Sequence, residues 1–151
     1  MTEYFDTPIL VFACANKGEV GQRARELVAA ATDPLTTPHA LAECFNALTY
    51  RLGIPPHTAR ALIAANTRRF RFVRIQEDDY FAAIDHVVSL GLTGDKVYDA
   101  LHAGAAVKGA AGKIHTSNHR DFSRFNLTIP IERTGPPRLP SESPTQAAAP
   151  E

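Results

Sequence analysis

The stretch VYDALHAGAAV, residues 97–107, predicts a helix that the rest of the protein encloses. Its apolar residues cover nearly the whole circumference of a helix, which is typical of a buried element. Asp99 nevertheless lies in the first turns of this helix. A lone carboxylate in apolar surroundings is strongly unfavourable or takes up a proton. The sequence therefore predicts that a cation or a set of hydrogen-bond donors compensates Asp99.

Strand-like and helical segments alternate along the chain around this helix. Runs of β-branched and aromatic residues predict strands at 3–5, 35–37, 70–75, 113–116 and 127–131. Apolar residues at helical spacing predict helices at 19–32, 38–52, 56–69, 78–90 and 95–111. Such alternation is typical of an α/β protein in which helices cover both faces of a central, mainly parallel sheet. We therefore expect this class, with about five strands.

Length and charge limit what the chain can be. A chain of 151 residues with 44% apolar residues has the size and the core of one domain. Basic and acidic residues balance at 16 each, so no global field attracts a polyanion. We expect the domain to occupy residues 1–132, and the stretch 133–151, rich in Pro, Ser and Ala, to be a disordered tail.

Further features indicate a cytoplasmic protein without a membrane partner. The N-terminus MTEYFD carries an acid where a signal peptide needs positive charge, and the apolar run at 9–15 is too short to cross a bilayer. Cys14 and Cys44 match no metal or redox spacing, so we expect both to be small buried apolar residues.

Polar side chains follow the predicted strands where a ligand of an open parallel sheet binds, beyond the carboxyl ends. They are Asp6, Glu43, Asp99, Thr116, Asn118 and Asp121. Carboxylates that converge at one edge repel one another, and a hard divalent cation such as Mg²⁺ or Mn²⁺ is their natural counter-charge.

Four stretches carry these residues: FDTPIL (5–10), ALAECFNAL (40–48), GDKVYDALHAGAA (94–106) and TSNHRDF (116–122). In order and spacing they resemble the PIN-domain nucleases, most closely the VapC toxin ribonucleases of bacterial toxin–antitoxin pairs. The resemblance extends from about Tyr4 to Phe125. It implies a three-layer α/β/α fold and a Mg²⁺-dependent endoribonuclease, usually a homodimer that a cognate antitoxin holds inactive.

The resemblance also implies roles for single residues. The catalytic set is Asp6, Glu43, Asp99, Asn118 and Asp121, of which the first three are the metal ligands, with Thr7, Asp95 and Thr116 as accessory residues. Metal held by these acids would activate water and stabilise charge on the scissile phosphate. The chain departs from the family pattern at Pro8, where Asn or Ser is usual, and at Asn118, where an acid is frequent.

Positive charge is expected to hold the RNA. Lys17, Arg51, Lys96 and Arg120 flank the proposed site in the sequence, so we expect them to contact phosphates. The denser basic stretch RRFRFVR at 68–74 alternates basic and aromatic residues, which favours a half-buried edge strand over a stacking surface. His102 is expected to be a packed or interface residue, and His39 a polar residue at the start of a helix.

Each candidate also has an ordinary structural explanation. Asp6 could cap a turn, Asp95 could cap a helix, and Glu43 could be a solvated helix residue. Thr116 and Asn118 could order the turn after a strand. Their joint occurrence favours the ribonuclease. The two departures from the family pattern keep an alternative open, a catalytically weak PIN-fold module that acts by binding RNA or an antitoxin.

Overall fold

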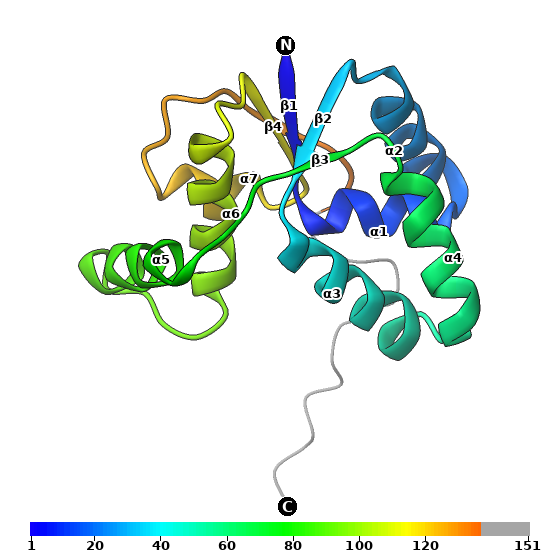
Figure 1. The fold of residues 1–151 in the computed structure, drawn as a ribbon, viewed down its shortest axis with the longest axis horizontal. Coiled ribbons are helices and arrows are strands. Elements are labelled where there is room, and N and C mark those ends of the chain that lie inside the picture. Colours follow the sequence, from blue (N-terminus) through cyan, green and yellow to red (C-terminus); the bar gives the residue numbers. More distant parts are fainter. Residues whose placement is uncertain (137–151) are drawn as a thin grey trace, which may run out of the picture.

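A computed structural model describes residues 1–136 of the chain (Figure 1). Its strands are β1 (Thr2–Phe5), β2 (Asp33–Thr36), β3 (Arg71–Phe72), β4 (Lys113–Thr116) and β5 (Ile131–Arg133). Its helices are α1 (Thr7–Ala15), α2 (Gly18–Ala30), α3 (Pro38–Asn46), the π-helical turn η1 (Ala47–Arg51), α4 (Pro56–Thr67), α5 (Glu77–Ser89), α6 (Lys96–Lys108) and α7 (His119–Ser123).

Within these residues, five strands form one sheet in the order β3-β2-β1-β4-β5, and each neighbouring pair is parallel. The strand β1 lies in the centre, where Tyr4 pairs with Leu35 of β2 and with Ile114 of β4. Because all strands run the same way, their carboxyl ends meet at one edge, the lower one in Figure 1. The predicted α/β class with about five mainly parallel strands is confirmed.

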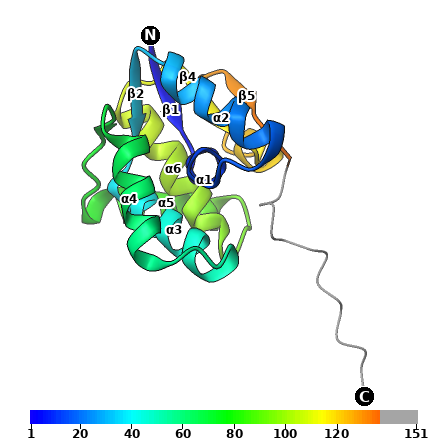
Figure 2. The same ribbon diagram turned by 90° about the vertical axis from the view of Figure 1, so that its right-hand side faces the viewer.

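Helices cover both faces of the sheet and make it the middle of three layers (Figures 1 and 2). Adjacent residues of β1 point to opposite faces, so Phe5 belongs to one core and Tyr4 to the other. The Phe5 core is filled by α1, α2, α3 and α4, and the Tyr4 core by α5, α6 and α7. The three-layer α/β/α architecture is therefore present.

Helix α6 is buried on most of its circumference, as expected for residues 97–107. Its buried residues are Ala100, Leu101, His102, Ala103, Ala105 and Ala106. Enclosure is nevertheless incomplete, because Tyr98 is 47% exposed and Val107 is 57% exposed.

The helix α1 is a central element that the sequence does not predict. Seven of its nine residues are buried. An apolar run without polar interruptions has no helical period that a pattern could reveal. Its start is nevertheless well specified, because Asp6 caps it by accepting from the Thr7 N–H, and Pro8 sits in the first turn, where no N–H is needed.

The last strand lies later in the chain than the sequence predicts. A strand was expected at 127–131, but β5 occupies Ile131–Arg133. Pro130 has no N–H to give to a ladder, while its carbonyl accepts from Ile114 N at 2.9 Å. Leu127 and Ile129 still pack against the core, from a loop.

Ordered structure also continues past the expected domain boundary at residue 132. Arg133 belongs to β5, and Thr134 is buried, with its N–H donating to the Thr116 carbonyl at 2.8 Å. The remainder of the predicted tail, residues 137–151, lies outside the described residues.

Three further expectations concern the helix at 38–52, the two cysteines and membrane-spanning segments. The helix expected at 38–52 divides into α3 and η1, where the Leu52 N–H bonds to the Ala47 carbonyl at 3.1 Å. Cys14 and Cys44 are free and buried, as predicted. In residues 1–136, no helix has the length and apolar character needed to cross a bilayer.

The basic stretch 68–74 is structural, and β3 is an edge strand. The expected alternation is only partly present, because Phe70 and Val73 are buried whereas Phe72 is 36% exposed. Arg71 pairs with Asp33 of β2 at 2.7 Å. The Arg69 guanidinium donates to the carbonyls of Val28, Ala29 and Ala31 at 2.8–3.2 Å, at the end of α2.

This contact predicts a specific loss of stability. Cations at a helix C-terminus satisfy unpaired carbonyls and oppose the helix dipole. We expect Arg69→Ala to lower the free energy of unfolding by about 1–2 kcal/mol in urea denaturation. The neighbouring exposed variant Arg68→Ala is the control and should change it by less than about 0.5 kcal/mol. Equal effects of the two variants would contradict the assignment.

Candidate active site

A cleft of about 980 Å³ opens at the carboxyl ends of the central strands. Its walls come from both helical layers: α1, α3 and η1 on one side, α6 and the segment after β4 on the other. The candidate residues that line it are Asp6, Thr7, Glu43, Arg51, Asp95, Lys96, Asp99, Asn118 and Asp121, together with His39, Tyr98 and His102. The polar residues that the sequence assigned to strand ends therefore do meet there.

Asp6 lies at the floor of this cleft, directly after β1, and is 2% exposed. Its Oδ1 accepts from the Thr7 N–H at 2.8 Å, and its Oδ2 accepts from Thr116 Oγ1 at 2.7 Å. Burial raises the pKa of Asp6, while the positive charge of His102 and these two donors oppose the rise. Asp6 is therefore held in one orientation by elements that are far apart in the sequence.

Glu43 reaches the cleft from the second turn of α3, a helix that Thr37 caps by accepting from the His39 N–H. Its Oε1 accepts from Thr7 Oγ1 at 3.2 Å and from His102 Nε2 at 2.7 Å. Burial opposes ionisation of Glu43, but the bond and charge of His102 outweigh it and lower the pKa. His102 thus favours the ionised form of Glu43.

His102 joins these acids and is the residue that sequence reasoning missed. It is 1% exposed, and its Nδ1 lies 2.6 Å from the Tyr4 hydroxyl oxygen and 3.7 Å from Asp6 Oδ1. Burial opposes the imidazolium, but the charge of Asp6 and the bond with Glu43 together raise the pKa of His102. It is packed, as expected, but it also supplies positive charge to the cluster. Its spacing of three residues from Asp99 was the available signal, because residues three apart share a helix face.

Asp99 completes the group from the first turn of α6. Burial, together with the charges of Asp6 and Asp121, raises the pKa of Asp99 to about 7. The carboxylate predicted to need compensation is therefore compensated in part by a proton near neutral pH. His102, on the same face of α6, carries a charge that lowers the pKa of Asp99.

Of the remaining predicted residues, Asp121, Lys96 and Asp95 line the cleft, and Lys17 and Arg120 do not. Asp121 lines the cleft but pairs with Lys96, whose Nζ donates to its Oδ2 at 3.0 Å. Asp95 stands at the start of α6 without a side-chain capping bond, so the capping explanation is wrong in that detail. Lys17 and Arg120 are exposed and lie outside the cleft. Lys17 is displaced because α1, about 13 Å long, separates it from Asp6.

The donor chemistry of the cleft fits a hard divalent cation. Asp6, Glu43 and Asp99 offer carboxylate oxygens, and the raised pKa of Asp99 reflects burial and negative charge that a cation would offset. Among residues 1–136, no three His, Cys, Asp or Glu side chains already converge to enclose an ion in this conformation. The hydrogen bond between Glu43 and His102 explains why the acids do not enclose an ion, because the Glu43 carboxylate is turned toward the imidazole.

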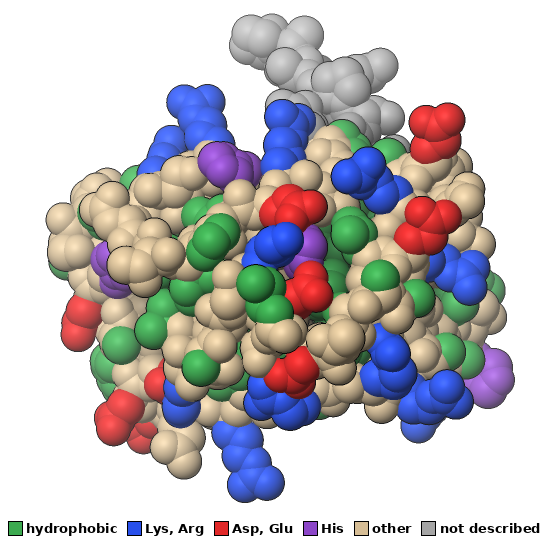
Figure 3. Space-filling view, turned by 90° about the horizontal axis from the view of Figure 1, so that it is seen from above, with side chains coloured by type: hydrophobic (Ala, Val, Ile, Leu, Met, Phe, Trp, Pro, Cys, Tyr) green, Lys and Arg blue, Asp and Glu red, His purple; other side chains and the backbone are tan. Residues whose placement is uncertain are grey.

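The opposite end of the sheet has a different character. Figure 3 looks onto the end where the strands begin, and red and blue side chains are interspersed there without a continuous field of one sign. Ion pairs join Asp33 to Arg71, Glu132 to Lys113 and Glu3 to His115, at 2.6–2.9 Å. Each of these acids faces a basic partner, whereas Asp99 in the cleft lies in the field of the two further acids Asp6 and Asp121.

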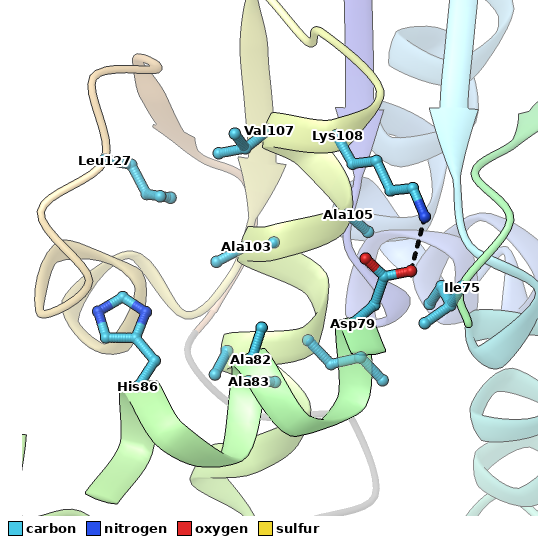
Figure 4. Close-up of a pocket in the computed structure, with 13 residues that line it drawn as sticks. Ile75, Asp79, Ala82, Ala83, His86, Ala103, Ala105, Val107, Lys108 and Leu127 are labelled. Atoms are coloured by element: carbon cyan, nitrogen blue, oxygen red, sulfur yellow. Dashed lines mark hydrogen bonds and ion pairs between the residues drawn. The ribbon is translucent and has the colours of Figure 1, made fainter. Parts of the chain in front are cut away.

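A second cavity, of about 290 Å³, lies between α5 and α6 (Figure 4). Alanine and aliphatic side chains form most of its wall. Its charged residues Asp79 and Lys108 neutralise each other across 2.6 Å, the contact drawn as a dashed line in Figure 4. The larger cleft is therefore the candidate active site.

The PIN domain family matches the chain over residues 4–126. The chain is a member of the PIN domain family. All the acids of the cleft fall within the matched residues of this PIN domain. The predicted family resemblance is confirmed at this level.

A solved structure has the same fold as this PIN domain: the crystal structure of VapBC2 from Rickettsia felis bound to a DNA fragment from their promoter. The TM-score is 0.66 at 18% sequence identity, and the superposition covers 89% of this chain and 100% of that chain. At this identity the likeness concerns the fold. Among curated proteins, none matches the chain significantly.

The raised pKa of Asp99 predicts how the stability of the PIN domain depends on pH. Between about pH 4, where an unfolded Asp ionises, and about pH 7, the folded protein keeps a proton that the unfolded chain has lost. The free energy of unfolding therefore falls as the pH rises through this window. Asp99→Asn removes this penalty, so in EDTA we expect it to be more stable than the wild type by roughly 2–4 kcal/mol above pH 7.

The stability that Asp99→Asn gains over the wild type should shrink as the pH falls toward 4. Urea denaturation at pH 4.5 and pH 8 measures it, with Asp95→Asn as the control because Asp95 is an exposed acid of the same cleft. The control should change stability by less than about 0.5 kcal/mol at both pH values. A destabilised Asp99→Asn at pH 8 would refute crowding of the acids.

The contacts of His102 predict the opposite effect for its removal. His102→Leu leaves the buried Tyr4 hydroxyl without this partner and deprives Asp6 and Glu43 of a cation. We expect the free energy of unfolding at pH 7 to fall by about 1–3 kcal/mol. His102→Gln, which keeps an amide donor, should lose less. Equal stability of His102→Leu and the wild type would show that the network contributes nothing.

Proposed function

We propose that this PIN domain is a Mg²⁺-dependent endoribonuclease, the toxin of a type II toxin–antitoxin pair that acts in the cytoplasm. The observation that carries the proposal is that Asp6, Glu43 and Asp99 all line one cleft at the carboxyl ends of parallel strands. Family membership supports it further, because PIN domains are generally nucleases.

In the proposed mechanism, Asp6, Glu43 and Asp99 would hold Mg²⁺, for which Mn²⁺ could substitute. When bound, a divalent cation lowers the pKa of a bound water and neutralises charge on a scissile phosphate. Thr7 and Thr116 fix the carboxylates of Glu43 and Asp6 through their hydroxyl groups.

Other residues of the cleft act on the substrate in this proposal. Arg51 and Lys96 line the cleft as the basic groups that contact phosphates, while Lys17 and Arg120 lie outside it. Asn118 and Asp121 follow β4 on the side opposite Glu43 and supply further polar groups, with Asp95 as an accessory acid.

A partner protein belongs to the proposal. One solved structure with the same fold is VapBC2 from Rickettsia felis bound to a DNA fragment from their promoter. By analogy we propose that this chain also pairs with an antitoxin and forms a homodimer. Co-expression with the product of the adjacent upstream reading frame should then relieve its toxicity in growing cells.

One alternative has its own supporting observations. Asn118 contributes no negative charge, and His102 holds Glu43 through the oxygen Oε1. Both features favour a catalytically weak module that binds RNA or an antitoxin without turnover. Pro8, in contrast, fits the first turn of α1 and does not disturb Asp6.

Cleavage of total RNA by the purified protein tests the two functions. In Mg²⁺ or Mn²⁺ we expect discrete fragments that EDTA abolishes. Asp99→Asn should reduce the rate at least about 100-fold, because even changes beside metal ligands typically cost 10- to 100-fold. A stably folded Asp99→Asn that still cleaves at the wild-type rate would refute the metal mechanism. Absence of fragments with every metal would favour the binding module.

A further inference from the structure

Three aromatic side chains gather at the rim of the cleft and have no part in the proposed chemistry. His39 of α3, Tyr80 of α5 and Tyr98 of α6 form this aromatic rim. The rings of His39 and Tyr98 are stacked, with centroids 5.5 Å apart and planes inclined by 18°. Tyr80 meets His39 edge to face, with centroids 6.4 Å apart and planes inclined by 78°. Three separate helices thus bring their rings to one place.

The aromatic rim adjoins the acids. His39 stands one helical turn before Glu43, and its Nε2 lies 3.7 Å from Glu43 Oε1. Tyr98 immediately precedes Asp99, and both His39 and Tyr98 line the cleft. A flat group that extends this stack would therefore lie beside the carboxylates.

The rings are also accessible. Tyr98 is 47% exposed and Tyr80 is 40% exposed, whereas the aromatic residues Tyr4, Phe5, Phe12 and Phe122 are almost completely buried. Exposed aromatic rings keep apolar surface in water, and a planar ligand can cover that surface by stacking. Phenol and imidazole groups leave the rim partly polar, which suits a heterocycle better than an aliphatic side chain.

Charge in the same cleft supports a nucleotide. Arg51 and Lys96, the latter bonded to Asp121, line it together with His39 and Tyr98, so base-stacking surface and basic groups occur in one cleft. This combination is typical of proteins that bind single-stranded nucleic acid, where each base has a π-face to stack. A base within a duplex is already stacked on its neighbours and cannot use the rim.

We propose that His39 and Tyr98 form a stacking site that holds one unpaired nucleobase of the RNA next to the scissile phosphate. This inference deepens the proposed function and rests on it for the identity of the ligand. Tyr98 is the terminal ring of the stack and supplies the contact, while Tyr80 holds His39 from the side.

Binding without cleavage tests the site. The probe is a short fluorescent single-stranded RNA whose anisotropy is measured in EDTA, so that no turnover is needed. We expect Tyr98→Ala to weaken binding about 5- to 150-fold, the usual contribution of one stacked base. Tyr98→Leu, which keeps apolar bulk without a π-system, should lose nearly as much, and Tyr98→Phe should retain the affinity. Phe81→Ala removes an aromatic ring that is 56% exposed and outside the cleft, and it should have no effect.

A second probe of the same length that carries abasic sugars separates stacking from phosphate binding. Wild type and Tyr98→Ala should bind this probe with equal affinity, because it has no base to stack. Equal losses on both probes, or no loss on either, would overturn the stacking site. A change of oligomeric state in Tyr98→Ala with unchanged RNA affinity would also overturn it and assign the rim to an interface. Base-dependent binding without metal-dependent cleavage would uphold the site and reject the nuclease.

Discussion

The imidazole of His102 holds the two walls of the cleft together. It belongs to α6, in the layer of the Tyr4 core, yet it contacts Glu43 of α3 and Asp6 at the start of α1 in the other layer. Without it, burial and mutual repulsion would oppose the approach of Asp6, Glu43 and Asp99. A buried cation that is part of the chain therefore lets the fold assemble acids that would otherwise separate the layers.

The electrostatics of the cleft divide its acids into two kinds. Glu43, bonded to His102, has a lowered pKa, whereas burial raises the pKa of Asp6 and brings that of Asp99 to about 7. Without metal the cluster reduces its negative charge through protons and an imidazolium. A divalent cation would have to replace these, so metal binding should release protons and be sensitive to pH.

The sequence predicts most of the fold and the acids of the site, because both follow from order along the chain. Polar residues after parallel strands converge at one edge whatever the details of packing, so Asp6, Glu43 and Asp99 could be found. Lys17 could not be placed, because it lies beyond α1, a helix without a polar face. The contacts of His102 could not be predicted either. Because α6 is apolar on most of its circumference, its sequence does not indicate which of its faces meets the acids. The apolar run at 127–131 predicted a strand, but Pro130 has no N–H for the ladder, and β5 therefore begins only at Ile131.

The bond between Thr116 and Asp6 spans 110 residues and has a consequence for synthesis of the protein. Asp6 leaves the ribosome 110 residues before Thr116, whose hydroxyl orients it, and Asn118 and Asp121 come later still. A nascent chain released before β4 lacks one wall of the cleft and the neighbour of β1 in the sheet. Fragments that end before β4 therefore lack the hydroxyl that orients Asp6, and the full lining of the cleft exists only after residues up to Asp121 have been made.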